Sequence, residues 1–141
     1  MHTFEVRRII AASPEAIWAH LTDASTLVAG GLGIRKLEGT IAPGAAIKVT
    51  SEVDPGRAFA LTVTEFTPSR RMVWSGGMPL GLFTGTRTFT LTPATGGTEF
   101  HMHETFTGLL APLIGRTLPD LQPSFELFAD GLKHLAEGST R

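Results

Sequence analysis

The sequence predicts an α+β fold in which a seven-stranded antiparallel sheet curls around one long C-terminal helix. The helix is expected over residues 120–137, because its large apolar residues recur at a 4-3-4-3 spacing that places them on one face. They are Leu121, Phe125, Phe128, Leu132 and Leu135. Residues 6–107 consist instead of short apolar runs broken by Gly and Pro, which is typical of strands and turns. One helix must therefore bury its apolar face against one sheet, and the space that such a sheet encloses favours a small apolar ligand.

The N-terminal segment predicts a strand over residues 3–11 and a helix over residues 13–22. Ser13 supplies a hydroxyl that can cap the free backbone N–H groups of the helix. Pro14 has a φ angle that suits the first helical position, and the carboxylate of Glu15 lies near the positive end of the helix dipole. A second short helix follows and ends at a pair of glycines.

Six further strands complete the sheet, and Gly and Pro turns separate them. They are expected over residues 34–41, 46–53, 58–66, 71–75, 83–92 and 98–107. Phe59, Leu61 and Val63 alternate with Thr62 and Thr64, which is the pattern of a strand with one buried face. The chain has no internal repeat or linker, so we expect residues 1–141 to form a single domain with two short helices between its first and second strands.

The composition excludes several classes of function. The 141 residues carry 12 Lys and Arg against 13 Asp and Glu, and this formal charge of −1 provides no basic surface for nucleic acid. The absence of Cys excludes disulfides and thiolate sites. No apolar run has the length of a signal peptide or a membrane span, so we expect a cytoplasmic protein that does not insert into membranes. The glycine-rich stretch that begins at Gly30 lacks the residue order of a phosphate-binding P-loop.

The order of the elements is one strand, two short helices, a six-stranded meander and a long helix. This order resembles the START-like superfamily, also called SRPBCC or Bet v 1-like, with its helix-grip fold. Four segments carry the resemblance, and they look like the bacterial polyketide cyclase/dehydrase branch: RRIIAASPEAIWAHLTD, VTEFTPSRRMVWSGG, RTFTLTPATGGTEFHMHETFTG and FELFADGLKHLAE. The resemblance implies a deep apolar cavity between sheet and helix that binds lipids, polyketides, hormones or other hydrophobic ligands, with catalysis in only some members.

The final predicted hairpin places two charged residues on its apolar face. Alternation from Phe89 and Leu91 turns Arg87 inward, and alternation from Phe100 turns Glu104 inward on the partner strand. If Leu91 lies opposite Phe100, Arg87 lies directly opposite Glu104, whereas a register two residues different leaves them diagonal. The two charges need each other on such a face, because an unpaired charge there is costly to desolvate. They either fix the strand register or orient a polar group of a ligand.

We expect the cavity wall to comprise inward-facing residues from the first helix, the sheet and the last helix. The candidates are Trp18, Phe59, Leu61, Trp74, Phe83, Arg87, Phe89, Phe100, Met102, Glu104, Phe125, Phe128 and Leu132. Large aromatic residues at such positions, as at Trp18 and Trp74, more often belong to the plain core. An apolar connection over residues 76–83 either packs onto the helix or forms a mobile lid at the mouth of the cavity. A similar apolar connection over residues 109–119 is expected to form a short helical turn that leads to the long helix, on the opposite side of the same mouth.

The histidines do not predict a metal site. Glu99, His101 and His103 share one face of the last strand, with a spacing that a metal could use. That face is the outer one, and a solvated polar exterior explains the residues without a metal. We therefore predict no metal and no cofactor.

Three classes of function remain. The favoured one is a non-enzymatic protein that binds a small hydrophobic molecule, lipid-like or polyketide-like, through burial of apolar surface. The alternative is a cyclase or dehydratase in which Glu104 acts as general base or acid and Arg87 stabilises an enolate-like oxygen. An arginine partner weakens a carboxylate as a base, and the chain has no Tyr to serve as an acid. The third class is a chaperone-activator-like interaction module, and the oligomeric state, a homodimer included, stays open.

Overall fold

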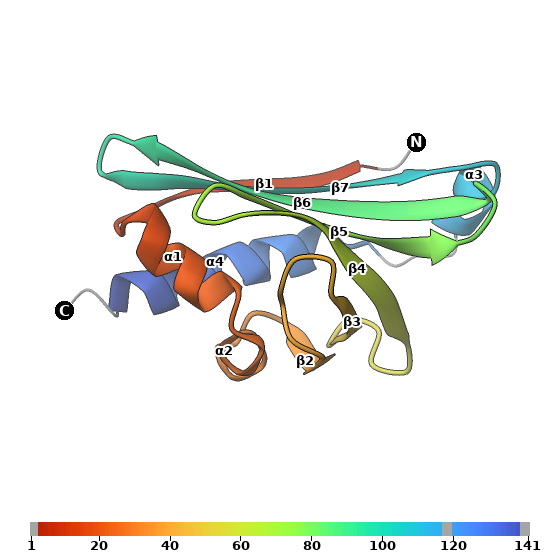
Figure 1. The fold of residues 1–141 in the computed structure, drawn as a ribbon, viewed down its shortest axis with the longest axis horizontal. Helices are drawn as coiled ribbons and strands as arrows, with labels where there is room; N and C mark the ends of the chain where they lie inside the picture. Colours follow the sequence, from red (N-terminus) through yellow and green to blue (C-terminus); the bar gives the residue numbers. More distant parts are fainter. Residues whose placement is uncertain (1–2, 117–119, 139–141) are drawn as a thin grey trace.

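The computed structural model describes residues 3–116 and 120–138, and its strands form one seven-stranded antiparallel sheet (Figure 1). In chain order the strands are β1 (Thr3–Ile10), β2 (Ile34–Glu38), β3 (Ala46–Ser51), β4 (Ala58–Thr67), β5 (Arg71–Met78), β6 (Phe83–Ala94) and β7 (Gly97–Thr107). The helices are α1 (Pro14–Leu21), α2 (Ala24–Ala29), α3 (Ala111–Gly115) and α4 (Gln122–Gly138). The strand order β1-β7-β6-β5-β4-β3-β2 brings the first strand beside the last. This architecture confirms the predicted α+β fold.

The sheet curls around α4. Figure 1 shows the long strands β1, β7, β6 and β5 on one side of the helix and the short strands β2 and β3 on the other, with β4 crossing between them. The helices α1 and α2 lie near the C-terminal half of α4. No helix within residues 3–116 or 120–138 is long and apolar enough to cross a membrane.

The helices α1 and α2 begin at side-chain caps. The Ser13 hydroxyl accepts a hydrogen bond of 3.1 Å from the Ala16 backbone N–H, as the sequence predicts for the start of α1. The Asp23 carboxylate accepts hydrogen bonds of 3.1 and 3.3 Å from the backbone N–H groups of Ser25 and Thr26 at the start of α2. These caps satisfy backbone donors that a helix start leaves free, and they set where the two helices enter the core.

The apolar face of α4 packs against the concave face of the sheet. Phe128 lies across the rings of Phe89 and Phe100, with centroid distances of 5.8 and 6.2 Å. Phe125 and Leu132 are also buried, which confirms the predicted direction of the stripe. The helix begins at Gln122 rather than at residue 120, because the Asp120 carboxylate accepts a hydrogen bond of 3.1 Å from the Gln122 backbone N–H and so precedes the first turn.

Polar side chains hold α4 alongside the edge strand β1. Lys133 Nζ donates to the backbone oxygen of Ile9 over 2.7 Å, and the Glu137 carboxylate accepts from the backbone N–H of Ala11 over 2.9 Å. Gln122 Nε2 donates to the backbone oxygen of Glu5 over 2.8 Å. An edge strand presents unpaired backbone groups, and here the helix satisfies several of them. The contacts therefore fix the lateral position of α4 as well as protecting the edge.

The strands differ from the sequence prediction where irregular geometry intervenes. β2 ends at Glu38 rather than at residue 41, next to Gly39, whose φ of 100° suits glycine. β5 extends to Met78 rather than to residue 75. A bulge in β4 between Val63 and Glu65 shifts the alternation of side chains, so that Phe66 packs on Trp18 with ring centroids 5.1 Å apart.

Replacement of Glu137 by Gln should reduce the loss of stability in acid. The hydrogen bond from Ala11 and the hydrogen bond from Lys133 hold the pKa of Glu137 below its usual value of 4.5. A carboxyl group with a lower pKa in the folded chain contributes stability above its unfolded pKa, and this contribution is lost as the pH falls through the folded value. Thermal melts at neutral pH and below pH 4.5 are expected to show a smaller drop in Tm for E137Q than for the wild type.

The matched control is E126Q on the same helix, where the carboxylate lies 3.8 Å from Arg8 Nη2. E126Q should retain the wild-type drop in Tm. A drop for E137Q as large as that of the wild type would show that the Glu137 contacts do not supply this stability.

Candidate functional site

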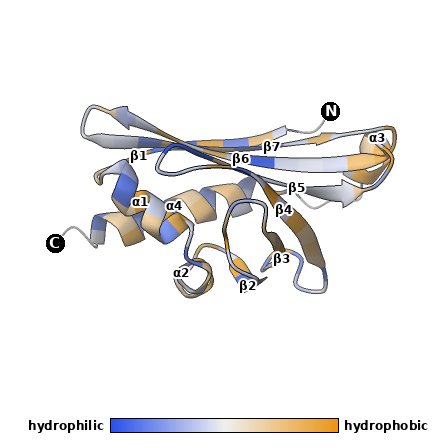
Figure 2. Ribbon diagram, in the orientation of Figure 1, coloured by the Kyte–Doolittle hydropathy of each residue, from blue (hydrophilic) through white to orange (hydrophobic). Residues whose placement is uncertain are grey.

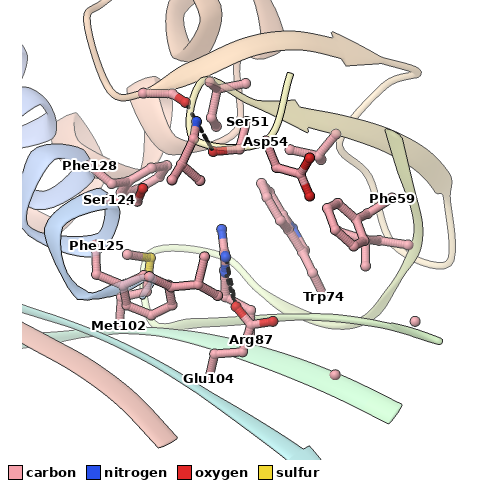
Figure 3. Close-up of a pocket in the computed structure, with 18 of the residues that line it drawn as sticks. Ser51, Asp54, Phe59, Trp74, Arg87, Met102, Glu104, Ser124, Phe125 and Phe128 are labelled. Carbon is pink, nitrogen blue, oxygen red and sulfur yellow. Dashed lines mark hydrogen bonds and ion pairs between the residues drawn. The ribbon is translucent and has the colours of Figure 1, made fainter. Parts of the chain in front are cut away.

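A cavity of about 300 Å³ lies between the concave face of the sheet and the first turns of α4 (Figure 3). Predicted residues that line it are Phe59, Leu61, Trp74, Phe83, Arg87, Met102, Glu104, Phe125 and Phe128. They come from β4, β5, β6, β7 and α4. The structure thus brings together most of the residues that alternation along the strands and the stripe on the helix predict for the wall.

Four predicted residues belong to the core rather than to the cavity wall. They are Trp18, Phe89, Phe100 and Leu132. Phe89 and Phe100 pack against Phe128, Phe89 packs also against Trp74, and Trp18 packs on Phe66. An inward direction is common to core and cavity residues, so alternation alone does not distinguish the two. The distinction depends on which part of the sheet α4 covers.

The wall also includes residues that sequence reasoning missed. The main group is Leu32, Gly33, Ile34, Val49, Ser51, Val53, Asp54, Ala58 and Ala60, around β2 and the β3–β4 hairpin. Ser124 contributes from α4, Leu121 from the position just before it, and Gly76, Gly77, Gly85 and Phe106 from the long strands. Leu121 belongs to the apolar stripe and Phe106 to the inward face of β7, so the sequence carried a signal for both. The sequence carried no such signal for the residues around the β3–β4 hairpin, because the position of this hairpin depends on the curl of the sheet.

Arg87 and Glu104 form an ion pair on the floor of the cavity. They lie directly opposite each other in the β6–β7 register, with Leu91 opposite Phe100, which is one of the two registers that the sequence left open. Arg87 Nε and Nη2 both donate to Glu104 Oε1, over 2.9 and 2.7 Å. The two side chains are 22% and 13% exposed. The pair is therefore largely removed from water, within an otherwise apolar surface.

The guanidinium of Arg87 is held on one edge and one face. Glu104 takes the edge formed by Nε and Nη2, and the ring of Phe125 lies 4.8 Å from the guanidinium carbon. Nη1 makes no hydrogen bond to any of the described residues, and Figure 3 shows the end of Arg87 directed into the open centre of the cavity. The pair consequently fixes the register of the hairpin and also presents a donor to the cavity.

Gly85 keeps the floor open beside the pair. A Cβ atom at this position would lie 3.1 Å from Phe106 Cε1 and 3.3 Å from Glu104 Oε2. Because Gly85 precedes Arg87 by two residues on the same strand face, any larger side chain would project into the cavity next to the carboxylate.

The mouth of the cavity lies near the β3–β4 hairpin. Val53 and Phe59 are 41% and 37% exposed although both line the wall. Asp54 lies beside them and is 3.5 Å from Arg57 Nε, and the Arg57 guanidinium carbon lies 5.8 Å from the Phe59 ring. A paired acid and exposed apolar side chains thus surround the opening.

The family model described as polyketide cyclase/dehydrase and lipid transport matches residues 1–137. The chain belongs to this family. None of the curated proteins matches the chain.

Solved structures of several proteins from bacteria share the fold. A protein from Mesorhizobium loti, MLL2253, is 22% identical with a TM-score of 0.77, over 98% of this chain and 98% of its own. TTHA0849 from Thermus thermophilus is 19% identical with a TM-score of 0.73, over 99% and 100%. The hypothetical protein jhp0584 from Helicobacter pylori is 13% identical with a TM-score of 0.77, over 96% and 88%. At these identities the likeness extends to the fold alone.

The two apolar connections lie together at one end of the molecule. Leu109 N–H donates to Gly81 O over 3.2 Å, and Leu110 N–H donates to Leu82 O over 2.8 Å. Leu80 is 93% exposed, so it does not pack onto the helix. Figure 2 shows this hydrophobic end around α3 and the turn between β5 and β6. Residues 117–119 of the second connection lie outside the described residues, and the lid role of the first stays a prediction.

The histidines of β7 lie on the outer face, away from the cavity. His101 Nε2 lies 2.6 Å from Glu5 Oε2, and the rings of His101 and His103 stack at 5.1 Å. Burial lowers the pKa of His103, which favours its neutral form. Within residues 3–116 and 120–138, no group of three or more His, Cys, Asp or Glu side chains is arranged to hold a metal ion.

Replacement of Glu104 by Gln should destabilise the fold, because Arg87 then keeps a partly buried charge without a counter-ion. Broken buried pairs cost about 3–5 kcal/mol, and the partial exposure of this pair points to the lower end of that range. The double variant R87M/E104L should recover most of the loss. Urea denaturation measures both effects.

The control for this prediction is E99Q, which breaks the exposed Arg7–Glu99 pair at 3.1 Å on the outer face of the same strand. This exposed pair should be worth about 1 kcal/mol or less. Equal effects of E104Q and E99Q would rule out a structural role for the inner pair.

Phe128 and Phe100 should respond differently to truncation, although both are buried. Phe100→Ala leaves a new void in a filled region and is expected to cost about 3–5 kcal/mol. Phe128 borders the cavity, so Phe128→Ala enlarges an existing space and should cost clearly less. Free energies of unfolding from urea denaturation compare the two, and a larger loss for Phe128→Ala would argue against a hollow interior.

Proposed function

We propose that this protein binds a small hydrophobic molecule, lipid-like or polyketide-like, in the cavity between the sheet and α4. The observation that carries the proposal is the cavity of about 300 Å³ with a mostly apolar wall. Its polar side chains, apart from the Trp74 indole, are Ser51, Asp54, Arg87, Glu104 and Ser124. Pockets for small molecules range over roughly 300–1000 Å³ and combine apolar walls with a few polar groups, and this cavity fits the lower end of that range.

Burial of apolar ligand surface would supply the affinity, at about 25 cal/mol per Å² removed from water. Aromatic rings line the space from three sides, with Trp74 on β5, Phe59 on β4 and Phe125 on α4. The family description, which includes lipid transport, supports a ligand of this kind. A flexible hydrocarbon chain or a fused ring system would suit such a wall, and the volume favours a single small molecule.

A cyclase or dehydratase activity is the second candidate. It has support from the family description and from two free groups at the ion pair, Glu104 Oε2 and Arg87 Nη1, which make no hydrogen bond to the described residues. Glu104 would move a proton and Arg87 would stabilise developing negative charge on an oxygen. Glu104 already accepts both hydrogen bonds of the ion pair through Oε1, and taking up a proton would leave the partly buried Arg87 without a counter-ion. Binding without turnover therefore has the better support.

The Ser124→Phe variant should abolish ligand binding without unfolding the protein. Ser124 lines the cavity from α4, so a phenyl group at this position would occupy space that the ligand needs. Titration with the uncharged fluorescent probe N-phenyl-1-naphthylamine should show at least about a tenfold weaker affinity than for the wild type. Thermal melts should show an unchanged or higher Tm.

Ser124→Ala is the matched control and should bind the probe as the wild type does. Native mass spectrometry of the wild type and of Ser124→Phe adds a test with no added ligand, since a copurified small molecule should appear only with the wild type. Equal probe affinity of the wild type and Ser124→Phe would mean that the probe binds elsewhere, which would refute the proposal.

A further inference from the structure

We propose that the Arg87–Glu104 pair makes the cavity select an uncharged ligand with an oxygen acceptor at its inner end, such as a ketone or an ester, over a carboxylate of equal chain length. This inference rests on the proposed function, because it concerns the ligand that the cavity binds. It names a role for the pair beyond fixing the strand register.

The floor of the cavity offers a hydrogen-bond donor. Arg87 is pinned by Glu104 and Phe125, and its remaining nitrogen, Nη1, faces the open centre (Figure 3). An apolar molecule that displaced water from this nitrogen would leave a charged donor unsatisfied, which is costly. A ligand oxygen at the same point would replace the water. The donor therefore favours a ligand with an inner acceptor over a plain hydrocarbon.

The charge of that donor is already balanced. Glu104 Oε1 lies 2.7 Å from Arg87 Nη2, so the pair has no net charge. Arg87 is the only Lys or Arg in the described wall, so that wall has no unpaired cation. The other acid in the wall, Asp54, lies 3.5 Å from Arg57 Nε. A ligand carboxylate at Nη1 would place two carboxylates around one guanidinium in a space with little water. Two carboxylates on the same guanidinium would lie close together, and like charges repel strongly when they are desolvated, so the cavity should reject an ionised acid.

Glu104 is the residue that sets this selectivity. With Gln at position 104, the guanidinium would keep its position beside a neutral acceptor but would lack a counter-ion. A ligand carboxylate would then supply the missing charge, in the charge-assisted geometry that arginine favours. The preference should invert with this one substitution.

The test compares 2-decanone, decanoate and decane, which share one chain length and differ only at the end group. Binding is followed by Trp74 emission in the W18F variant, in which Trp74 in the cavity wall is the sole tryptophan. The measurements are made at a pH at which decanoic acid is fully ionised in water. We expect 2-decanone to bind at least about tenfold more tightly than decanoate and several times more tightly than decane.

In W18F/E104Q, decanoate should bind more tightly than 2-decanone. In W18F/R87M/E104L, decane should still bind while the advantage of 2-decanone over decane is lost. The R87M/E104L replacement removes both charges, so it still tests whether the pair causes the advantage of 2-decanone over decane if E104Q fails to fold.

Three outcomes would overturn the inference, and they can be told apart. Equal affinities for ketone and carboxylate in W18F, or tighter binding of decanoate, would refute the charge selectivity and leave the proposed function intact. Retention of the ketone advantage in W18F/R87M/E104L would show that other groups hold the oxygen. Failure of all three probes to bind would refute the proposed function and the inference together.

Discussion

The position of α4 against the sheet determines both the core and the cavity. Phe128 covers Phe89 and Phe100, and beyond it the C-terminal half of the helix buries Leu132 and Ala136. On the N-terminal side of Phe128 the helix instead forms the roof of an open space. Phe128 thus lies at the boundary between a filled part and a hollow part of the concave face. A shift of the helix along its axis by one turn, about 5.4 Å, would move this division.

Polar contacts set the lateral position of the same helix. Lys133, Glu137 and Gln122 bond to backbone groups of β1 and its immediate continuation, so α4 lies close to one edge of the sheet. The opposite side, where the β3–β4 hairpin curls under the helix, is left with exposed apolar side chains at its rim. Protection of an edge strand and access to the cavity therefore have a common structural cause, because the helix that covers one side cannot fill the other.

The ion pair in the floor combines structural and functional properties. Its hydrogen bonds lie directly across a hairpin and lock the register, which is a sufficient structural reason for the two charges. However, two guanidinium nitrogens of Arg87 donate to the same oxygen of Glu104, and the third nitrogen, Nη1, faces the cavity. A neutral pair with a free donor provides polarity without net charge. Such a group can orient a bound molecule at little electrostatic cost, provided that the molecule is itself uncharged.

The sequence by itself determined the elements and the direction of their side chains. Alternation along β6 and β7 was enough to turn Arg87 and Glu104 to the same inward face, because a slip by one residue would have turned the whole apolar set outward. It left open whether the two residues lie directly opposite or diagonal, and the structure shows them directly opposite. Only the tertiary structure decided which inward residues border the cavity. Phe100 and Met102 have the same inward alternation on β7, but Phe100 packs against Phe128 in the core and Met102 lines the cavity. Local periodicity reports a residue's direction, whereas the space in front of it depends on contacts between α4, β1 and the β3–β4 hairpin, which lie far apart in the chain.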